Sequence, residues 1–448
     1  MAGGAADSVA GVNPPPLTAV PVRVGLLGCG NVGASFVQLV EARRADILKR
    51  TGLDLIVTRV AVRSVAKGRS VTVDPSVLTT DAASVVADPD VDLVVELIGG
   101  VEPARGLILA ALAAGKPVIT GNKELLANHA TELFAAADAA AVDLLFEAAV
   151  AGGIPLIRPL RESLLGEPIS RVMGIVNGTT NYILTRMTEA GAGYHAALAE
   201  AQQLGYAERD PTADVEGYDA GAKMAIIAMI AFGARVVAGD VFHEGISGIT
   251  QADIAVGTRL GYRIKLLGVA ELFGDADNPE IAVRVHPAMV PVQHPLAAVR
   301  DSFNAVFIEG SAVGDLMFYG RGAGGFPTAS AVLGDVIDAA MNKRQGTHAP
   351  IGAFALVPIR SIDELTSAYY LSLEVADRPG VLARVADAFG RHDVSIRSME
   401  QEGLGTEARL IFITHVATER NLQATLHELR ELDAVDRIVS VLRVIAPD

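Results

Sequence analysis

An acidic segment that ends in a single lysine carries the residue types best suited to moving a proton. Asp219 and Lys223 are four residues apart near the start of an apolar stretch, over about 220–232, that is predicted to be a helix. Residues at this spacing project from one face of a helix, and a lysine among carboxylates can give a proton to a reacting oxygen. The same spacing also fits an ordinary ion pair on a protein surface. The carboxylates that precede this helix, in a loop that could fold over that face, are Glu208, Asp210, Asp214 and Glu216.

A glycine-rich turn near the start of the chain has the spacing that binds a dinucleotide. It follows an apolar run at 22–27 and precedes a stretch compatible with a helix to about residue 49. In such a unit the first glycine permits a tight turn, the second lets a pyrophosphate approach the backbone, and the third lets the helix pack on the strand. The helix N-terminus attracts the anion. An ordinary connection between a strand and a helix is the alternative. The predicted cofactor contacts here are Gly28, Gly30, Asn31, Val32 and Gly33.

The end of the second predicted strand bears on the choice of cofactor. A run at 55–62 ends in Arg63 and Ser64, with Lys67 and Arg69 shortly beyond. An acidic residue there would bind the ribose 2′-hydroxyl of NAD, whereas basic groups suit the 2′-phosphate of NADP. We therefore expect NADP, with Arg63 among its contacts, and NAD remains possible. The alternative is that Arg63 is a solvated loop residue.

The composition argues against several other functions. Of the 448 residues, 37 are Lys or Arg and 52 are Asp or Glu, and the formal net charge of −15 disfavours a general nucleic-acid-binding protein. The longest apolar stretches, at 91–98 and 224–232, are too short to span a membrane. One cysteine cannot form an internal disulfide, so we expect a cytoplasmic protein. Because that residue, Cys29, lies inside the glycine turn, a covalent acyl-enzyme mechanism is not expected.

The elements that must position these residues begin with an α/β unit. Over 18–150, continuous apolar runs alternate with helical stretches, which indicates a Rossmann-type, doubly wound parallel sheet covered on both faces. A second glycine-rich turn at 320–325 and the helix after it, to about 345, are predicted to rejoin this dinucleotide-binding domain. The other predicted strands lie at 55–62, 91–98 and 117–120, and the predicted helices at 104–114 and 130–140.

The middle of the chain, 151–319, is predicted to be an α+β domain for catalysis and dimerisation. A polar turn at 177–181 has hydroxyls that could cap the helix after it. A connection at 346–365 contains Pro and Gly and is predicted to be a linker. Residues 1–17 are rich in Ala, Gly and Pro and are predicted to be a disordered tail. The predicted strands of the middle domain lie at 281–285, 305–308 and 315–319.

The last part of the chain, 366–448, has a pattern of its own. Its order of strands and helices, βαββαβ, is typical of a ferredoxin-like domain. The predicted strands lie at 370–375, 394–400, 407–414 and 435–444, and the predicted helices at 381–391 and 419–432.

The segment 201–223 resembles the signature of the homoserine dehydrogenase family at every fixed position. The resemblance extends over about 18–448 and includes the first glycine turn, 120–123, 177–181, the second glycine turn, and a C-terminal segment similar to an ACT regulatory domain. The signature residues are Ala201, Gly205, Asp210, Pro211, Asp214, Gly217, Asp219 and Lys223.

The resemblance implies an NAD(P)-dependent enzyme that interconverts L-homoserine and L-aspartate 4-semialdehyde, on the route to threonine, methionine and isoleucine. It implies that Lys223 is the proton donor and that Lys123 contacts the nicotinamide and the substrate and shares the proton role, so which lysine transfers the proton stays open. It also implies cofactor contacts at Gly205 and Gly320. The implied substrate-binding residues are Thr179, Glu208, Asp214 and Asp219, the last counted with the catalytic group.

Two further sites are implied by the resemblance alone. A monovalent cation such as Na⁺ would be held by main-chain oxygens of Glu147, Val150, Gly152 and Ile154, where the alternative is a plain connector between domains. Asp377 and Gly380 match the ligand-binding turn of ACT domains, with threonine as the expected feedback effector. The alternative for this domain is a dimer-stabilising module without a ligand. A homodimer or homotetramer is expected.

Two other functions stay open at this point. One is a dehydrogenase acting on a different small amino-acid alcohol. The other is a catalytically silent amino-acid sensor whose lysines and carboxylates are structural and whose Rossmann domain reads the NADPH pool.

Overall fold

The computed structural model describes residues 18–66, 71, 73–275, 277–403 and 407–445. Its N-terminal sheet is wholly parallel and has the strand order 3-2-1-4-5-6 of a doubly wound nucleotide-binding fold. In such a sheet, ligands bind beyond the carboxyl ends of the strands where the order reverses, which here is between β1 and β4. The strands are β1 (Val20–Leu27), β2 (Leu53–Ala61), β3 (Leu78–Thr79), β4 (Leu93–Glu96), β5 (Val118–Thr120) and β6 (Leu144–Leu145).

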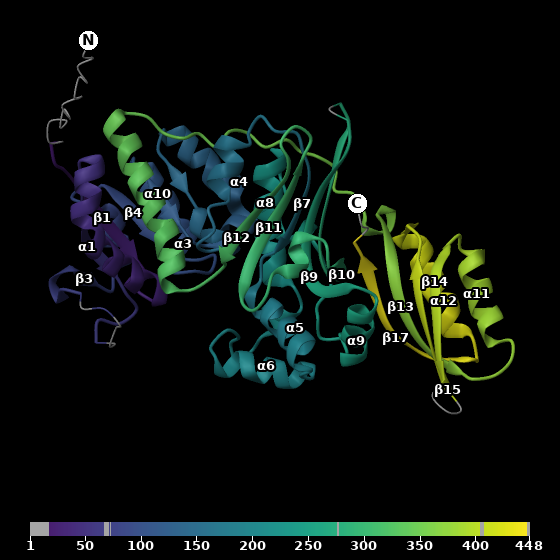
Figure 1. The fold of residues 1–448 in the computed structure, drawn as a ribbon. Helices are drawn as coiled ribbons and strands as arrows, with labels where there is room; N and C mark the ends of the chain where they lie inside the picture. Colours follow the sequence, from purple (N-terminus) through teal and green to yellow (C-terminus); the bar gives the residue numbers. More distant parts are fainter. Residues whose placement is uncertain (1–17, 67–70, 72, 276, 404–406, 446–448) are drawn as a thin grey trace, which may run out of the picture.

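Helices from two distant parts of the chain cover this sheet. One of them, α10 (Gly325–Gln345), lies beside α1 although the middle domain separates the two in sequence (Figure 1). Buried Val332 and Val336 of α10 share a core with Phe36 and Val40 of α1. The other helices are α1 (Asn31–Thr51), α2 (Ala82–Ala87), α3 (Ala104–Ala113) and α4 (Lys123–Ala140).

Helix α4 begins seven residues earlier than the stretch predicted at 130–140, at Lys123. The cause is local: the side-chain oxygen of Asn122 accepts a hydrogen bond from the Leu125 amide at 3.1 Å, which caps the helix. Lys123 is therefore fixed at the first helical position, three residues after Thr120 ends β5.

The middle domain is built on an antiparallel sheet in the order β12-β11-β7-β9-β10. Helix α8 packs closely on this sheet at Gly268 in β9. A Cβ at this position would collide with the side chain of Met224 in α8, so the absence of a side chain permits the close approach. The strands are β7 (Ile169–Ile175), β8 (Phe242–His243), β9 (Tyr262–Gly274), β10 (Pro279–Pro291), β11 (Phe303–Gly310) and β12 (Gly314–Arg321), and the helices are α5 (Gly178–Ala190), α6 (Tyr194–Gln203), α7 (Thr212–Val215), α8 (Tyr218–Phe232) and α9 (Gln251–Arg259).

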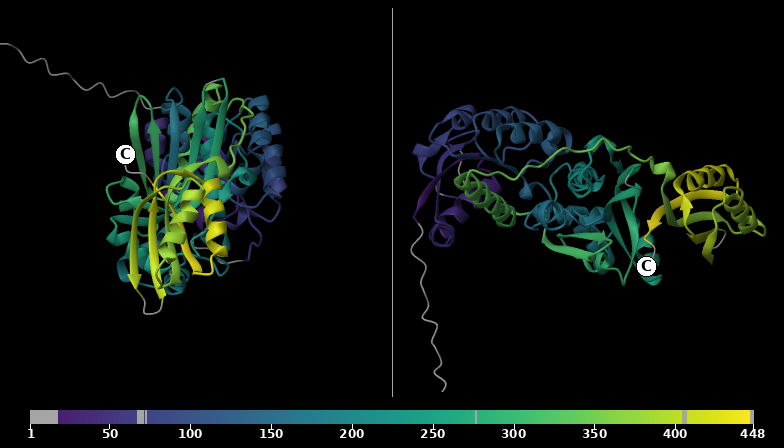
Figure 2. Two further views of the ribbon diagram at one scale, coloured as in Figure 1. Left: turned by 90° about the vertical axis from the view of Figure 1, so that its right-hand side faces the viewer. Right: turned by 90° about the horizontal axis from the view of Figure 1, so that it is seen from above.

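The C-terminal domain has the ferredoxin-like strand order β17-β13-β15-β14, with both helices on one face. The chain reaches it from α10 along an extended connection that crosses the length of the molecule (Figure 2). Its strands are β13 (Thr366–Ala376), β14 (Ile396–Gly403), β15 (Glu407–Thr414), β16 (Ala417–Thr418) and β17 (Val435–Val444), and its helices are α11 (Val381–Arg391) and α12 (Glu419–Glu431).

A seam of two residue pairs joins the sheets of the middle and C-terminal domains. Strand β17 lies parallel to β10, with Arg443 opposite Ala288 and Val444 opposite Met289, so one eleven-stranded sheet runs through both domains. The buried Arg443 guanidinium also pairs with Glu244, just after β8, at 2.6 Å. The fold class predicted from the sequence is confirmed.

Short helical turns complete the described chain. They are η1 (Pro75–Val77), η2 (Glu147–Ala149), η3 (Pro159–Ser163), η4 (Ala238–Asp240), η5 (Pro295–Ala298) and η6 (Ile362–Glu364). Among the described residues, no helix has the length and apolarity needed to cross a bilayer.

Candidate active site

A buried carboxylate lies between two lysines where the nucleotide-binding and middle domains meet. Asp219, on the first turn of α8, accepts a hydrogen bond from Lys223 Nζ at 2.7 Å on its Oδ2 atom and pairs through Oδ1 with Lys123 of α4. The side chains of Asp219 and Lys223 are only 8% and 12% exposed, so the surface ion pair considered from the sequence is excluded. Lys123 is more open, at 43%. Lys223 Nζ also donates to the carbonyl oxygen of Val176 at 2.7 Å.

Asn177 ties this group to the neighbouring loop. Its Nδ2 donates to Asp219 at 2.9 Å and to Asp214 at 2.7 Å. Its Oδ1 accepts from the Thr180 amide at 2.9 Å and so caps α5. The sequence had suggested hydroxyl caps at 177–181, but the cap is this carboxamide, because extended backbone at Asn177 directs its oxygen to the third helical amide. One residue thus fixes two carboxylates and the start of a helix.

Burial and neighbouring charges shift the pKa values of Asp219, Lys123 and Asp214. Burial alone would raise the pKa of Asp219, but the two ammonium groups beside it hold that pKa far below its usual range. Burial alone would lower the pKa of Lys123, yet the adjacent Asp219 charge raises it above the ordinary value. Burial raises the pKa of Asp214, and the Asn177 hydrogen bond opposes the rise only in part. At neutral pH, Asp219 is therefore a carboxylate and Lys123 an ammonium.

The first glycine turn leaves room for a ligand at one position only. A Cβ at Gly28, where φ is +96°, would lie 2.6 Å from the Leu97 carbonyl oxygen, and a Cβ at Gly33 would collide with the Gly28 carbonyl. At Gly30, the N-cap of α1, a Cβ would meet nothing within 4 Å. The outer two glycines therefore serve packing, and open space lies before the first amides of α1, where Asn31 and Val32 begin the helix.

The second glycine turn packs against the first. A Cβ at Gly325, which starts α10, would collide with Ser35 and lie 3.0 Å from Asn31 Oδ1, both in α1. Two helix N-termini therefore meet at one place, and both favour negative charge there. Gly320 lies at the end of β12, where a Cβ would lie 3.2 Å from Ile154.

Four other predicted substrate and cofactor residues, Thr179, Gly205, Glu208 and Arg63, make no hydrogen bond to Lys123, Asp219 or Lys223 within the described chain. Thr179 is buried, and its hydroxyl donates to the Tyr206 carbonyl at 2.7 Å, next to exposed Gly205. Glu208 is exposed, and no side-chain contact in the described chain joins it to Asp219. Arg63 is exposed just beyond β2. Lys67 and Arg69, named with it from the sequence, lie outside the described residues.

The segment predicted to hold a cation makes an unusual turn. Ala151 and Gly152 both have left-handed backbone, at φ +55° and +54°. Within the described chain, the main-chain oxygens of Val150 and Gly152 accept no backbone hydrogen bond. Unpaired carbonyls in a buried turn fit a hard monovalent cation. The Glu147 carboxylate is occupied otherwise, because it accepts the amides of Leu156, Ile157 and Arg158.

The turn at 377–380 lines a cavity of about 320 Å³ in the C-terminal domain. Gly380, at φ +88°, forms the N-cap of α11, and Asp377 lies beside Gln401 across the cavity. The cavity can take a molecule of amino-acid size.

Three family models match the chain. The model described as "Homoserine dehydrogenase" matches 155–337, "Homoserine dehydrogenase, NAD binding domain" matches 28–147, and "ACT domain" matches 369–434.

Curated relatives are similar over almost the full length. The homoserine dehydrogenase of Mycobacterium tuberculosis (strain ATCC 25618 / H37Rv) is 50% identical over 432 residues, which cover 95% of this chain and 98% of the relative. That of Corynebacterium glutamicum is 51% identical over 425 residues, which cover 94% and 95%.

Solved structures have the same fold. A homoserine dehydrogenase from Thiobacillus denitrificans has a TM-score of 0.90 at 41% identity, covering 96% of this chain and 99% of its own. A hyperthermophilic archaeal homoserine dehydrogenase mutant in complex with NADPH has a TM-score of 0.61 at 27% identity, covering 72% and 98%.

Proposed function

The chain belongs to the homoserine dehydrogenase family, a family of NAD(P)-dependent oxidoreductases, and we propose that it interconverts L-homoserine and L-aspartate 4-semialdehyde with NADP(H). The observation that carries this proposal is that buried Asp219 lies between Lys123 and Lys223. Lys123 follows β5 at the same carboxyl edge of the parallel sheet at which β1 leads into the first glycine turn. The reaction belongs to the route that makes threonine, methionine and isoleucine. We assign nucleotide binding to residues 18–150 together with 320–345, and catalysis and dimerisation to residues 151–319. Residues 346–365 are assigned as the linker and 366–448 as the regulatory domain.

Lys223 is the proposed proton donor. When bound, the reduced nicotinamide supplies a hydride to the carbonyl carbon of the semialdehyde. The Lys223 ammonium gives its proton to the carbonyl oxygen, so an alcohol forms and the lysine is left neutral until solvent returns a proton. Asp219 holds that ammonium in one place through the 2.7 Å bond. Lys123, which is more exposed and shares the same carboxylate, is the candidate for the shared proton role.

Carboxylates around this group are suited to the amino-acid end of the substrate. Carboxylates bind an α-ammonium best. Asp214 and Asp219 lie close together, because both accept hydrogen bonds from the side-chain amide of Asn177. Thr179 and Glu208 are proposed to complete the substrate site. Glu208 would have to turn inward from its exposed position to do so.

The cofactor preference proposed is for NADP over NAD. Gly28, Gly30, Asn31, Val32 and Gly33, with Gly205, Gly320 and Lys123, would hold the dinucleotide. Open space at Gly30 and the two helix N-termini support the fit to a pyrophosphate. Exposed Arg63, with no acidic residue where β2 ends, supports a 2′-phosphate contact. One structural neighbour is itself an NADPH complex.

A cation site is also proposed. A monovalent cation such as Na⁺ would be bound by main-chain oxygens of Glu147, Val150, Gly152 and Ile154.

The C-terminal domain is proposed to regulate the enzyme. Threonine would bind at Asp377 and Gly380 and inhibit the enzyme. Inhibition requires that threonine bind two states of the enzyme with different affinity. Assembly as a homodimer or homotetramer is proposed too, and light scattering of the purified chain tests it.

One assay tests the central proposal. NADPH absorbance is followed after L-aspartate 4-semialdehyde is added, with NADH in parallel, and the reverse reaction is compared on homoserine, serine and threonine. We expect NADPH absorbance to fall when the semialdehyde is added. In the reverse reaction we expect homoserine to react faster than serine or threonine. A flat trace would favour a silent sensor, and a better rate on serine or threonine would favour a different amino-acid dehydrogenase.

A further inference from the structure

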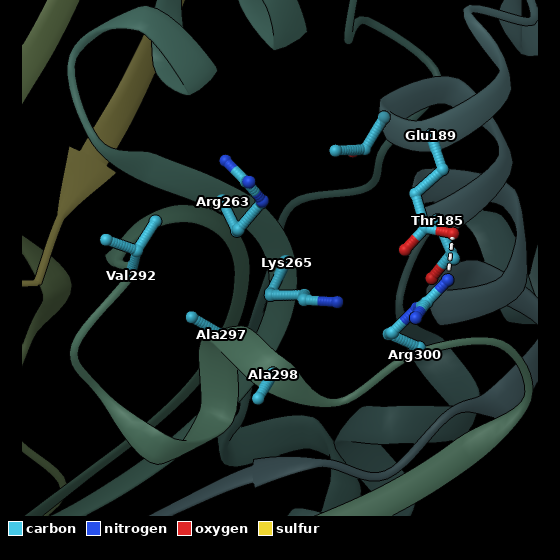
Figure 3. A pocket seen from close by; sticks show the side chains of 9 residues that line it. Thr185, Glu189, Arg263, Lys265, Val292, Ala297, Ala298 and Arg300 are labelled. Carbon is cyan, nitrogen blue, oxygen red and sulfur yellow. Dashed lines mark hydrogen bonds and ion pairs between the residues drawn. The ribbon is translucent and has the colours of Figure 1, made fainter.

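A second polar cavity, apart from the site described above, lies between the C-terminal half of α5, strand β9 and the η5 turn. Its volume is about 270 Å³, and three cationic side chains enter it from two separate parts of the chain (Figure 3). Arg263 and Lys265 come from β9, and Arg300 follows η5. The remaining lining residues are Thr185, Thr188, Glu189, Val292, Ala297 and Ala298.

Lys265 is a buried ammonium without a counter-ion. It is 5% exposed, and within the described chain it makes no ion pair. Its Nζ donates to Asn181 Oδ1 at 3.0 Å and to the Val299 carbonyl, which occupies two of its three N–H groups. A buried charge without an opposite charge is costly to a fold unless something neutralises it.

The neighbouring charges do not compensate the positive charge of Lys265. Burial, with the charges of Arg263 and Arg300 adding to it, lowers the pKa of Lys265 to about 8, and Glu189 and Asp301 offset the shift only in part. Glu189 is engaged by Arg300 at 2.5 Å on the exposed rim. Arg263 uses one N–H group, to the Tyr262 carbonyl at 3.1 Å, and has no carboxylate partner in the described chain.

Hydrogen-bond donors therefore outnumber acceptors in the cavity. The threonine hydroxyls already donate along α5, Thr185 to Asn181 and Thr188 to Leu184. The donors left over belong to Arg263, Lys265 and Arg300, whose side chains surround the cavity in Figure 3. We propose that this cavity is a binding site for a small oxyanion, a phosphate or carboxylate group, held by Lys265 from below and by Arg263 and Arg300 at the rim.

A bound oxyanion would also fix α5. Lys265 holds Asn181, whose Nδ2 donates to Asp301 and Phe303 carbonyls at 2.9 and 3.2 Å, so the cavity floor and the first turns of α5 are one network. The expected effect of the anion is on stability, because it neutralises the buried charge on which this network rests.

The test is thermal unfolding of the full chain with increasing inorganic phosphate, and separately acetate, at an ionic strength held constant with NaCl. Saturating NADPH is present in every sample, so that phosphate cannot act through the glycine turns. Lys265→Met and Arg263→Gln remove donors from the cavity. Lys116→Met is the matched control, because Lys116 is also buried and its Nζ also donates to two oxygen acceptors, here the main-chain carbonyls of Val86 and Asp88.

A saturable rise in unfolding temperature with phosphate or acetate is expected for the wild-type chain and for Lys116→Met. The apparent affinity should fall about tenfold or more in Lys265→Met and in Arg263→Gln, the loss of one charge-assisted hydrogen bond. If Lys265→Met does not fold, Arg263→Gln alone decides, since Arg263 is only partly buried. No rise with either anion, or an equal rise in the cavity variants, would overturn the proposal.

Discussion

Asp219 and Lys223 lie one helical turn apart on α8, and both side chains are largely buried. The Asp219 carboxylate accepts a hydrogen bond from the Lys223 ammonium at 2.7 Å. The i, i+4 spacing that is worth little on a surface here places a charged amine at one position in the interior. Because Lys123 contacts the other oxygen of the same carboxylate, removing either lysine leaves Asp219 with a partner.

Replacing the proposed proton donor should abolish most turnover without unfolding the chain. Lys223→Ala is expected to lower turnover about 10²–10⁴-fold, the loss typical of a missing general acid. The unfolding temperature should change little, since Lys123 still pairs with Asp219. Lys343→Ala, at an exposed lysine bonded to the Asp92 carbonyl, is the control. Unchanged turnover in Lys223→Ala would remove this residue from the mechanism.

Asp219→Asn should shift the pH dependence of both activity and stability. Without the carboxylate, the pKa of Lys123 loses the charge that raises it, so the basic limb of the rate profile should move to lower pH. The depressed pKa of Asp219 stabilises the fold above the ordinary value of 3.8, and this stabilisation is lost as the pH falls below it. The wild-type advantage in urea unfolding should therefore be large at pH 7 and shrink in acid. An advantage that stays constant with pH would contradict this account.

Asn177 has two roles that two substitutions can separate. Asn177→Ala removes the cap of α5 and should cost about 1 kcal/mol in the free energy of unfolding. Asn177→Ser keeps a capping oxygen but loses the amide that joins Asp214 to Asp219, so its stability should stay near wild type while the KM for homoserine rises. Chemical denaturation and steady-state kinetics measure the two effects. Equal KM values in wild type and Asn177→Ser would limit Asn177 to capping.

Arg63→Ala should weaken the preference for NADP. The KM for NADPH is expected to rise about tenfold or more, as for loss of a charge-assisted hydrogen bond, while the KM for NADH stays nearly constant. Arg59→Ala is the control, because Arg59 lies on β2, the strand that precedes Arg63, and pairs with Asp88. Parallel rises for both cofactors would mean that Arg63 does not contact the 2′-phosphate.

Threonine should inhibit the enzyme through the turn at 377–380. Added threonine is expected to lower the rate in the wild-type chain, and Asp377→Asn should weaken this inhibition while leaving the uninhibited rate as it was. The matched variant is Asp433→Asn, at an exposed carboxylate of the same domain that pairs with Arg384. Inhibition that is equal in the three proteins would place the threonine site elsewhere.

Features encoded by neighbouring residues could be predicted from the sequence. The glycine turn is one such feature. Others are α11 at 381–391, β15 at 407–414 and β17 at 435–444, whose apolar periodicity is local. Strand β7 (Ile169–Ile175) was not predicted, because Arg171 and Gly174 interrupt its apolar pattern and its partners, β9 and β11, come much later in the chain.

The site itself depended on contacts that no local pattern contains. Asn177 meets Asp214 and Asp219 across 37 and 42 residues, so its bridging role could not be seen in a turn that also fits a simple helix cap. The two glycine turns are nearly three hundred positions apart in the chain, yet Gly325 packs on Asn31. The oxyanion cavity draws its cations from β9 and the turn after η5. Only the folded structure shows that Lys265 pairs with no carboxylate among the residues it describes.

The seam between β10 and β17 joins the C-terminal domain to the middle domain through main-chain pairing. Strands are stiff along their length, so a rotation of the C-terminal domain must either twist β10 or break two backbone pairs. Glu244 pairs with Arg443, and its main-chain amide donates a hydrogen bond to the carbonyl oxygen of Val285 in β10 at 2.8 Å. The Val285 side chain in turn packs against Gly217, where a Cβ would lie 3.0 Å from it. Gly217 immediately precedes α8, so this series of contacts connects the C-terminal domain to the start of the helix that carries Asp219 and Lys223.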